Sequence, residues 1–164
     1  SASCITATTY EDEKNISKST QENANMLRRM GATVKHGVDA TNLEKHFPYG
    51  RFDTIAFQFP NVGSRFPLEG RNPNFIMIRD FLKSATRCLD RHGKVMITAV
   101  DSPYYQGTFQ FDEAADVAGF KKPEVYSFDP DKLPGYSHTN TNDENTALDE
   151  HEKFCTWVFS LKDR

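Results

Sequence analysis

Strand-like and helix-like apolar patterns alternate along this chain, and the alternation limits its possible folds more than any other feature. Runs rich in β-branched and aromatic residues predict strands at 4–10, 33–38, 52–59, 94–100, 125–128 and 154–161. Helical spacing and capping residues predict helices from Ser19 to Gly31, from Asn72 to Gly93 and at 111–118. The order predicts an α/β fold with a mostly parallel sheet.

The last two predicted strands follow each other without a helix between them. We therefore expect these two strands to form an antiparallel pair at the edge of the sheet. Dinucleotide-binding folds commonly end on parallel strands, whereas a reversed last strand resembles the ending of the Rossmann-like methyltransferase fold. The run at 52–59 is almost continuously apolar, which predicts a strand covered on both faces.

Composition restricts the partners of the chain. A length of 164 residues suits a single domain, and a net charge of −3 with a pI of about 5.9 excludes a uniformly basic surface. The three cysteines lack metal-ligand spacing, which favours a reducing intracellular compartment and no metal site. No run approaches the roughly 20 apolar residues of a membrane span, and the first residues do not resemble a signal peptide.

Polar and aromatic residues follow four of the predicted strands, where open α/β sheets bind their ligands. An acid after one strand can accept hydrogen bonds from ribose hydroxyls, and an acid after the next can accept from an adenine amino group. A loop of carboxamides, proline and aromatic residues can hold a planar base. The alternative for each residue is a helix cap or a plain turn. The residues concerned are Tyr10, Glu11, Asp39, Ala40, Gln58, Phe59, Pro60, Asn61, Asp101 and Tyr104.

Two further features are candidates for recognition. The polar stretch 129–152, with Tyr136 and His138, is long for a loop in a compact domain, which is typical of a lid or of a flexible surface segment. A stacking and phosphate-binding surface is the second candidate, against the alternative of core aromatics and ordinary surface charge. Its members would be Tyr104, Tyr105, Phe109, Arg65, Arg71, Lys121 and Lys122.

Five segments resemble, in order, the Rossmann-like domain of the 25S rRNA (uridine-N3) methyltransferases. They are ITATTYEDE, HGVDATNLEKH, FDTIAFQFPNVG, GKVMITAVDSPY and FDPDKLPGYSH. The resemblance implies methyl transfer from S-adenosylmethionine (SAM) to N3 of a uridine in large-subunit rRNA, in the nucleolus of a eukaryote. The family pattern has Asn where this chain has Gln58, and commonly His where it has Asn61.

The resemblance also implies roles for the residues at the strand ends. Asp101 and His138 would act as bases that assist removal of the N3 proton. Tyr10, Glu11, Asp39, Ala40, Gln58 and Phe59 would bind the cofactor. Pro60, Asn61, Tyr104 and Tyr136 would bind the acceptor nucleotide.

One strand of the family pattern is lacking. The family has a strand and a glycine-rich GEGNFSFS-like loop ahead of ITAT, and that strand lies centrally, between those at 4–10 and 52–59. We expect residues 1–164 to be one methyltransferase domain truncated at its N-terminus, with a gap in the sheet. Alternatively, the strand comes from elsewhere, or the two orphaned strands pair directly. Whether this chain alone binds SAM stays open.

Two other functions remain alternatives. A non-catalytic relative could bind RNA or protein without methylating it. A complete six-stranded nucleotide-binding domain would need a phosphate loop after Tyr10, but EDEKNISK contains no glycine and begins with acids. The oligomeric state is not indicated.

Overall fold

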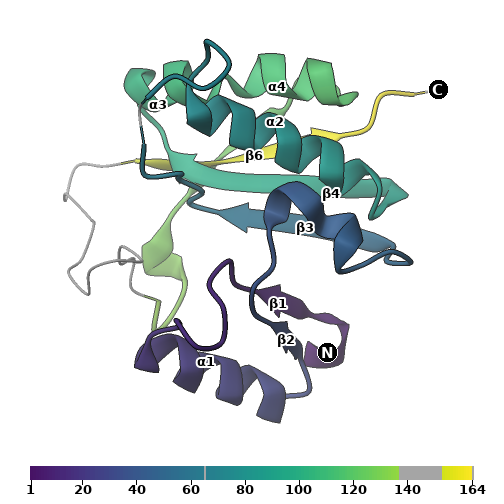
Figure 1. Cartoon of the computed structure of the whole chain (residues 1–164), viewed down its shortest axis with the longest axis vertical. Coiled ribbons are helices and arrows are strands. Elements are labelled where there is room, and N and C mark those ends of the chain that lie inside the picture. Colours follow the sequence, from purple (N-terminus) through teal and green to yellow (C-terminus); the bar gives the residue numbers. More distant parts are fainter. Residues whose placement is uncertain (65, 137–152, 164) are drawn as a thin grey trace.

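The strands of the protein form two separate sheets. The computed structural model describes residues 1–64, 66–136 and 153–163. Strands β1 (Thr6–Thr8) and β2 (Thr33–Lys35) form a parallel pair. Strands β3 (Phe52–Gln58), β4 (Leu89–Val100), β5 (Glu124–Phe128) and β6 (Phe154–Ser160) form the second sheet in the order β3-β4-β6-β5 (Figure 1).

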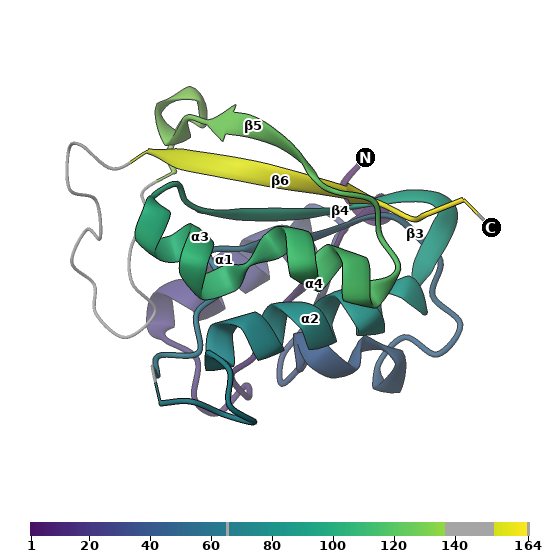
Figure 2. The ribbon, with the colours of Figure 1, turned by 90° about the horizontal axis from the view of Figure 1, so that it is seen from above.

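The larger sheet has the predicted reversed strand. β3 and β4 are parallel, whereas β6 runs antiparallel to both β4 and β5. In Figure 2 the helices α2 (Pro73–Thr86), α3 (Pro103–Phe109) and α4 (Phe111–Ala118) lie together on one face of this sheet. The remaining helices are α1 (Lys18–Arg29) and the 3₁₀ turns η1 (Ala2–Cys4), η2 (Ala40–Lys45) and η3 (Pro130–Lys132).

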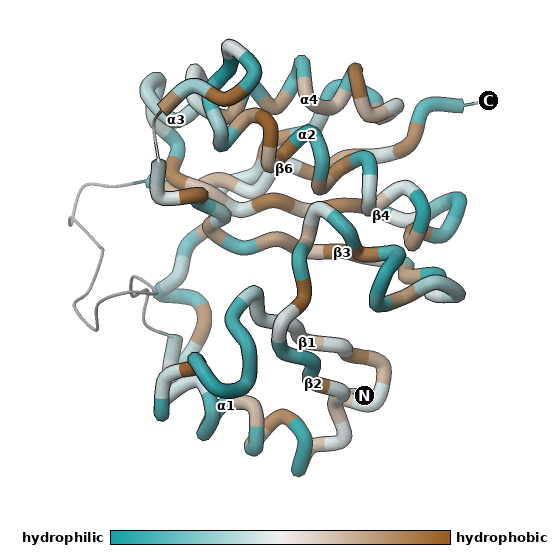
Figure 3. The backbone as a smooth tube through the Cα atoms, in the orientation of Figure 1, coloured by the Kyte–Doolittle hydropathy of each residue, from teal (hydrophilic) through white to brown (hydrophobic). Residues whose placement is uncertain are grey.

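The core lies between the four-stranded sheet and its helices. Phe81 of α2, Val95 and Ile97 of β4, and Phe159 of β6 are almost completely buried. Figure 3 shows hydrophobic residues running along β3, β4 and α2, while α1 is largely hydrophilic. Ala24 is the single buried residue of α1. Most of the hydrophobic stabilisation therefore belongs to the larger sheet.

The predicted gap in the sheet is present. β1 pairs with β2 and β3 pairs with β4, and no ladder joins β1 to β3 among the described residues. In Figure 1 the pair β1–β2 lies on the β3 side of the larger sheet. The interpretation that the orphaned strands pair directly is therefore wrong, and so is a single sheet built from six strands. Each of these edges carries backbone groups that lack a strand partner.

The structure corrects two predicted helix boundaries. The cap of α1 is Ser17, whose Oγ accepts a hydrogen bond from the amide of Thr20 at 3.1 Å, and not the capping box at Ser19. The helix α2 ends at Thr86, and Gly93 lies inside β4. A Cβ at residue 93 would come within 2.6 Å of Leu89, so this close approach, and not a helix stop, accounts for the glycine.

One other prediction was wrong and one helix was missed, although Gly119 does end α4 with a positive φ as expected. Only one face of β3 is covered: Phe57 packs on Phe81, whereas Ala56 and Gln58 are exposed. The helix α3 was not predicted, although Ser102 caps it and proline occupies its first turn.

Candidate functional site

The carboxyl ends of β3, β4 and β5 meet at one edge of the larger sheet. Gln58 at the end of β3 is paired with Thr98 of β4. The next residue, Phe59, donates its amide to the Thr98 carbonyl at 2.8 Å and adopts a φ of +51°. A phenylalanine in the left-handed region is strained, and such strain persists where the surroundings hold it in place.

An aromatic cluster holds Phe59 in that conformation. Its ring lies edge-on to Phe154 at 5.2 Å and to Phe128 at 6.1 Å between centroids. Tyr136 lies edge-on to Phe128 at 6.5 Å. These are favourable aromatic geometries, so the cluster ties the loop after β3 to the segment after β5. Phe128 and Phe154 were missed as site residues because the alternation in their strands indicated only core positions.

The loop after β3 has a fixed shape near the sheet. Asn61 accepts a hydrogen bond at Oδ1 from the amide of Gly63 at 2.7 Å, which closes a turn. The amide of Val62 donates to the buried Oδ1 of Asn74 at 3.0 Å. Pro60 is buried. The plain-turn alternative thus accounts for the side-chain oxygen of Asn61 and for the buried Pro60.

Asp101 is anchored by two hydrogen bonds where β4 ends. Its amide donates to the carbonyl of Lys153 at 2.8 Å, and its Oδ1 accepts from Nε2 of Gln106 at 2.9 Å. The Asp101 carboxylate also acts on the thiol of Cys155, whose pKa it raises. The helix α3 supplies Gln106 and starts directly after Asp101, which fixes the direction of the carboxylate.

The alkylation rate of the Cys155 thiol reports on its burial and on the nearby Asp101 carboxylate. Burial raises the pKa of Cys155, and the Asp101 carboxylate raises it further. Burial and Glu44 raise the pKa of Cys88, while Cys4 is exposed. A raised pKa reduces the reactive thiolate at pH 8, so both buried cysteines should alkylate at least about tenfold more slowly than Cys4. Mass spectrometry of iodoacetamide-treated protein measures these rates, and equal rates would contradict the buried placement.

The predicted stacking surface around Tyr104 does not form. Tyr104 is half-exposed, but Tyr105 packs on Phe109, and Phe109 belongs to the core. Arg71 forms a close ion pair with Glu113 at 2.9 Å, while Lys121 and Lys122 form longer, exposed pairs with Asp163 and Asp112. Arg65 lies outside the described residues, as does His138. For the other residues predicted for this surface, the alternative holds: they are core aromatics or surface charges in ion pairs.

The predicted cofactor residues after β1 and β2 form a second group. The amide of Gly37 donates to the Glu11 carbonyl at 2.9 Å, and Thr9 Oγ1 donates to the same carbonyl at 2.9 Å. Asp39 caps η2 by accepting from the amide and hydroxyl of Thr41 at 2.8 and 2.7 Å. Tyr10 is 75% exposed and Ala40 is partly buried. Both capping hydrogen bonds use the same carboxylate oxygen of Asp39, Oδ1.

The structure thus brings the predicted residues together in two groups. Tyr10, Glu11, Asp39 and Ala40 surround the ends of the two-stranded sheet. At the edge of the larger sheet lie Gln58, Phe59, Pro60, Asn61, Asp101, Tyr104 and Tyr136.

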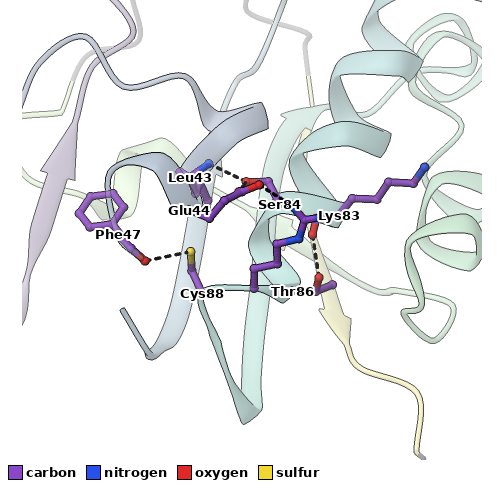
Figure 4. A network of polar contacts seen from close by, with 8 residues as sticks. Leu43, Glu44, Phe47, Lys83, Ser84, Thr86 and Cys88 are labelled. Atoms are coloured by element: carbon purple, nitrogen blue, oxygen red, sulfur yellow. Dashed lines mark hydrogen bonds and ion pairs between the residues drawn. The ribbon is translucent and has the colours of Figure 1, made fainter. Parts of the chain in front are cut away.

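A small hollow between η2 and the end of α2 is a less suitable cofactor site than the sheet edge. It has a volume of about 180 Å³ and is lined by Thr41, Glu44, Asp80, Lys83, Ser84 and Arg87. Figure 4 shows Ser84 Oγ accepting from the amide of Leu43 and donating to Glu44, which also pairs with Arg87. These polar groups satisfy one another and fasten η2 to the end of α2. Cofactor sites are usually larger, about 300–1,000 Å³, so we assign this hollow a structural role.

Two further features are absent from the part of the chain that the structure describes. No group of three or more His, Cys, Asp or Glu side chains is placed to hold a metal ion. None of these helices has the length and apolar character needed to cross a membrane.

Comparison with known proteins yields a family and a fold. A family model described as rRNA (uridine-N3-)-methyltransferase BTM5-like matches residues 1–140. An uncharacterized protein of Arabidopsis thaliana is 30% identical over 83% of this chain and 69% of its own length. The heavy metal-associated isoprenylated plant protein 41 of Arabidopsis is 30% identical over 74% of this chain. A mouse homolog of ferredoxin-fold anticodon-binding domain-containing protein 1 is 28% identical over 85%. The matched region is 24% of each of these last two proteins.

Solved structures show the fold. An antibiotic-related methyltransferase superposes with a TM-score of 0.55 at 13% identity, covering 96% of this chain and 75% of its own. A 30S ribosomal A1408 methyltransferase from an uncultured bacterium gives 0.50 at 11% identity, covering 96% and 87%. The architecture is therefore Rossmann-like, of the methyltransferase type. At these identities the likeness shows the fold alone. The reaction has to be inferred from the residues of the site.

Proposed function

This chain belongs to the BMT5-like family of rRNA (uridine-N3-)-methyltransferases, and from that premise we propose that it forms the SAM-dependent domain of an enzyme methylating N3 of a uridine in large-subunit rRNA. The observation that carries the proposal is the anchored carboxylate of Asp101 beside the loop that follows β3. Such a protein would meet its substrate in the nucleolus or the cytoplasm.

The residues after β1, β2 and β3 fit parts of the cofactor. Glu11 and Asp39 supply carboxylates suited to ribose hydroxyls and an adenine amino group, and Phe59 supplies an aromatic surface near Gln58. The gap between β1 and β3 lies where a central strand and its glycine-rich loop would support the methionine part of SAM in the family pattern. When bound, SAM would supply the methyl group that is transferred.

The chemistry at the acceptor requires loss of a proton. Uridine N3 carries a proton near neutral pH, so the ring becomes a good nucleophile only as that proton leaves. The hydrogen bond from Gln106 holds the Asp101 carboxylate in a fixed direction, which suits a proton acceptor at N3. The loop at Pro60 and Asn61, with Tyr104 and Tyr136, would hold the base. Orientation then supplies much of the rate enhancement. His138, outside the described residues, remains a second proposed base.

We further propose that a strand from outside this sequence fills the gap between β1 and β3 and brings the glycine-rich loop with it. The single domain of residues 1–164 would then be a truncated form of the complete domain. Free interior strand edges are costly in a native sheet, and a strand there would satisfy the backbone groups of both.

Calorimetry of SAM binding tests the cofactor proposal. We expect the protein extended upstream through that strand to bind SAM and S-adenosylhomocysteine. We expect this chain alone to bind at least about a hundredfold more weakly, because the loop facing the methionine part is lacking. Asp39→Ala in the extended protein serves as the site control and should weaken binding. Equal binding by both lengths would refute the completing strand, and no binding by either would refute SAM dependence.

The interrupted sheet also favours a second function, a non-catalytic module that binds RNA or protein. In that case Gln58, which departs from the family's Asn, would no longer contact a cofactor. Absence of SAM binding by the extended protein, combined with retained RNA binding, would select this alternative.

A further inference from the structure

The outer edge of β5 is a candidate interaction surface. β5 is the last strand in the order β3-β4-β6-β5, and in Figure 2 it forms the margin of the sheet. No strand in the described part of the chain pairs with its outer side. Val125 and Tyr126 point to opposite faces and are 54% and 55% exposed. A strand edge with exposed apolar side chains on both faces is a template for another strand.

The charges that flank β5 are arranged with opposite signs. Lys121 and Lys122 precede the strand, which begins with Glu124, and Asp129 and Asp131 follow it, with Lys132 next. The first end therefore keeps a net positive charge and the second a net negative charge. Within the chain the two lysines form only loose, exposed ion pairs, at 3.6 Å to Asp163 and 3.8 Å to Asp112. Such pairs contribute little to stability, so the lysines are available to a partner of opposite charge.

An antiparallel pairing of two β5 strands satisfies this charge pattern. A two-fold axis near Tyr126 places the basic end of each strand against the acidic end of the other. In this register the two Tyr126 side chains are neighbours on one face. The lysines before each β5 then lie near the partner's acids after β5, which belong to the cap and the turn of η3. A parallel pairing would place like charges together. The pattern therefore selects both the partner and its direction.

We propose that the β5 edge is a self-association surface, at which a second copy of this chain pairs through its own β5 to extend the sheet across both molecules. The contact is small, about five residues of strand on each side with flanking charges, so we expect a weak dimer in the micromolar range or above.

The edges of β3 and β1 lack this pattern. β3 is preceded by Arg51 and followed by the uncharged residues 59–61, so pairing two β3 edges would gain nothing from charge. The edge of β1 lies on the side of the molecule that faces β3 (Figure 1). The β5 edge alone among these combines outward position with complementary ends.

Sedimentation velocity over a concentration series tests the dimer, with charge variants as the decisive comparison. We expect Lys121→Glu/Lys122→Glu to be monomeric, because acidic ends then meet acidic ends, and Asp129→Lys/Asp131→Lys to be monomeric for the opposite reason. An equimolar mixture of the two variants should form a heterodimer, since every contact then pairs opposite charges. The wild-type dimer should weaken at least about tenfold when salt rises from about 0.05 to 0.5 M.

Controls separate association from folding. Asp112→Asn/Asp163→Asn removes the intramolecular partners of the lysines and should leave the dimer intact. Thermal unfolding checks that each variant is folded, because Asp129 also caps η3. The proposal is overturned by a wild-type protein that stays monomeric at millimolar concentration, by dimers that persist in either charge variant, or by a mixture that does not associate.

Discussion

Replacing Asp101 by Asn is expected to lower the single-turnover rate of methyl transfer to uridine-containing rRNA by about 100- to 10,000-fold in the complete domain. The substitution keeps the size of the side chain and its hydrogen bond from Gln106, but it removes the group that accepts the N3 proton. A single-turnover assay with labelled SAM isolates this step from product release. The loss should appear in the rate of the chemical step and not in SAM affinity, because Asp101 is not among the proposed cofactor residues.

The matched control lies on the same strand. Asp90, near the start of β4, accepts a hydrogen bond from the amide of His92 and lies at the opposite end of the strand from Asp101. Asp90→Asn should therefore retain the wild-type rate. If Asp101→Asn and His138→Ala both keep full single-turnover rates, neither residue acts as the base, and the proton must leave N3 by another route.

The same substitution has a second consequence that does not need RNA. Asp101 raises the pKa of Cys155 in addition to burial, so Asp101→Asn should lower that pKa and speed alkylation of Cys155 at pH 8. Cys88 does not have Asp101 among the causes of its raised pKa and should be unchanged. Faster alkylation of Cys155 with an unchanged alkylation rate of Cys88 would confirm that the substitution perturbs the site locally, without loosening the core.

Elements with local determinants were predictable from the sequence. The helix at 111–118 was predicted with the bounds observed, because its apolar spacing and Gly119 act within a few residues of each other. The reversed last strand followed from the lack of a helix before it. The gap beside β3 followed from the family pattern, and it appears in the strand order.

Features that depend on tertiary contacts were not predictable. The positive φ of Phe59 is maintained by Phe128 and Phe154, which are about 70 and 95 residues away along the chain. Gly93 looked like a helix stop because a stop and a close approach within a strand both favour glycine, and only Leu89 distinguishes them here. The same limit applied to the loop at Asn61, where the next amide, of Val62, donates to Oδ1 of Asn74 on α2.

Replacing Phe159 by Ala is expected to lower the free energy of unfolding by about 3–5 kcal/mol, a large share of the stability of an ordinary domain. Phe159 has no exposed surface, and its ring contacts Phe111 at 6.3 Å and Phe120 at 6.1 Å between centroids. Removing the ring leaves a cavity among rigid aromatic neighbours that can collapse only in part. Urea denaturation followed by the fluorescence of Trp157, on the same strand, measures the change.

The control for this loss is Phe66, a phenylalanine that is 85% exposed on the loop after β3. Phe66→Ala should change the free energy of unfolding by less than about 0.5 kcal/mol, since it removes no buried surface. A Phe159→Ala effect as small as this would show that the four-stranded sheet does not carry the stability.

Far-UV circular dichroism, which also reports on α1, adds a second comparison. Because α1 buries only Ala24, we expect its signal to be lost at lower urea than Trp157 fluorescence. Coincident transitions would instead mean that the β1–β2 unit unfolds together with the larger sheet despite the gap between them.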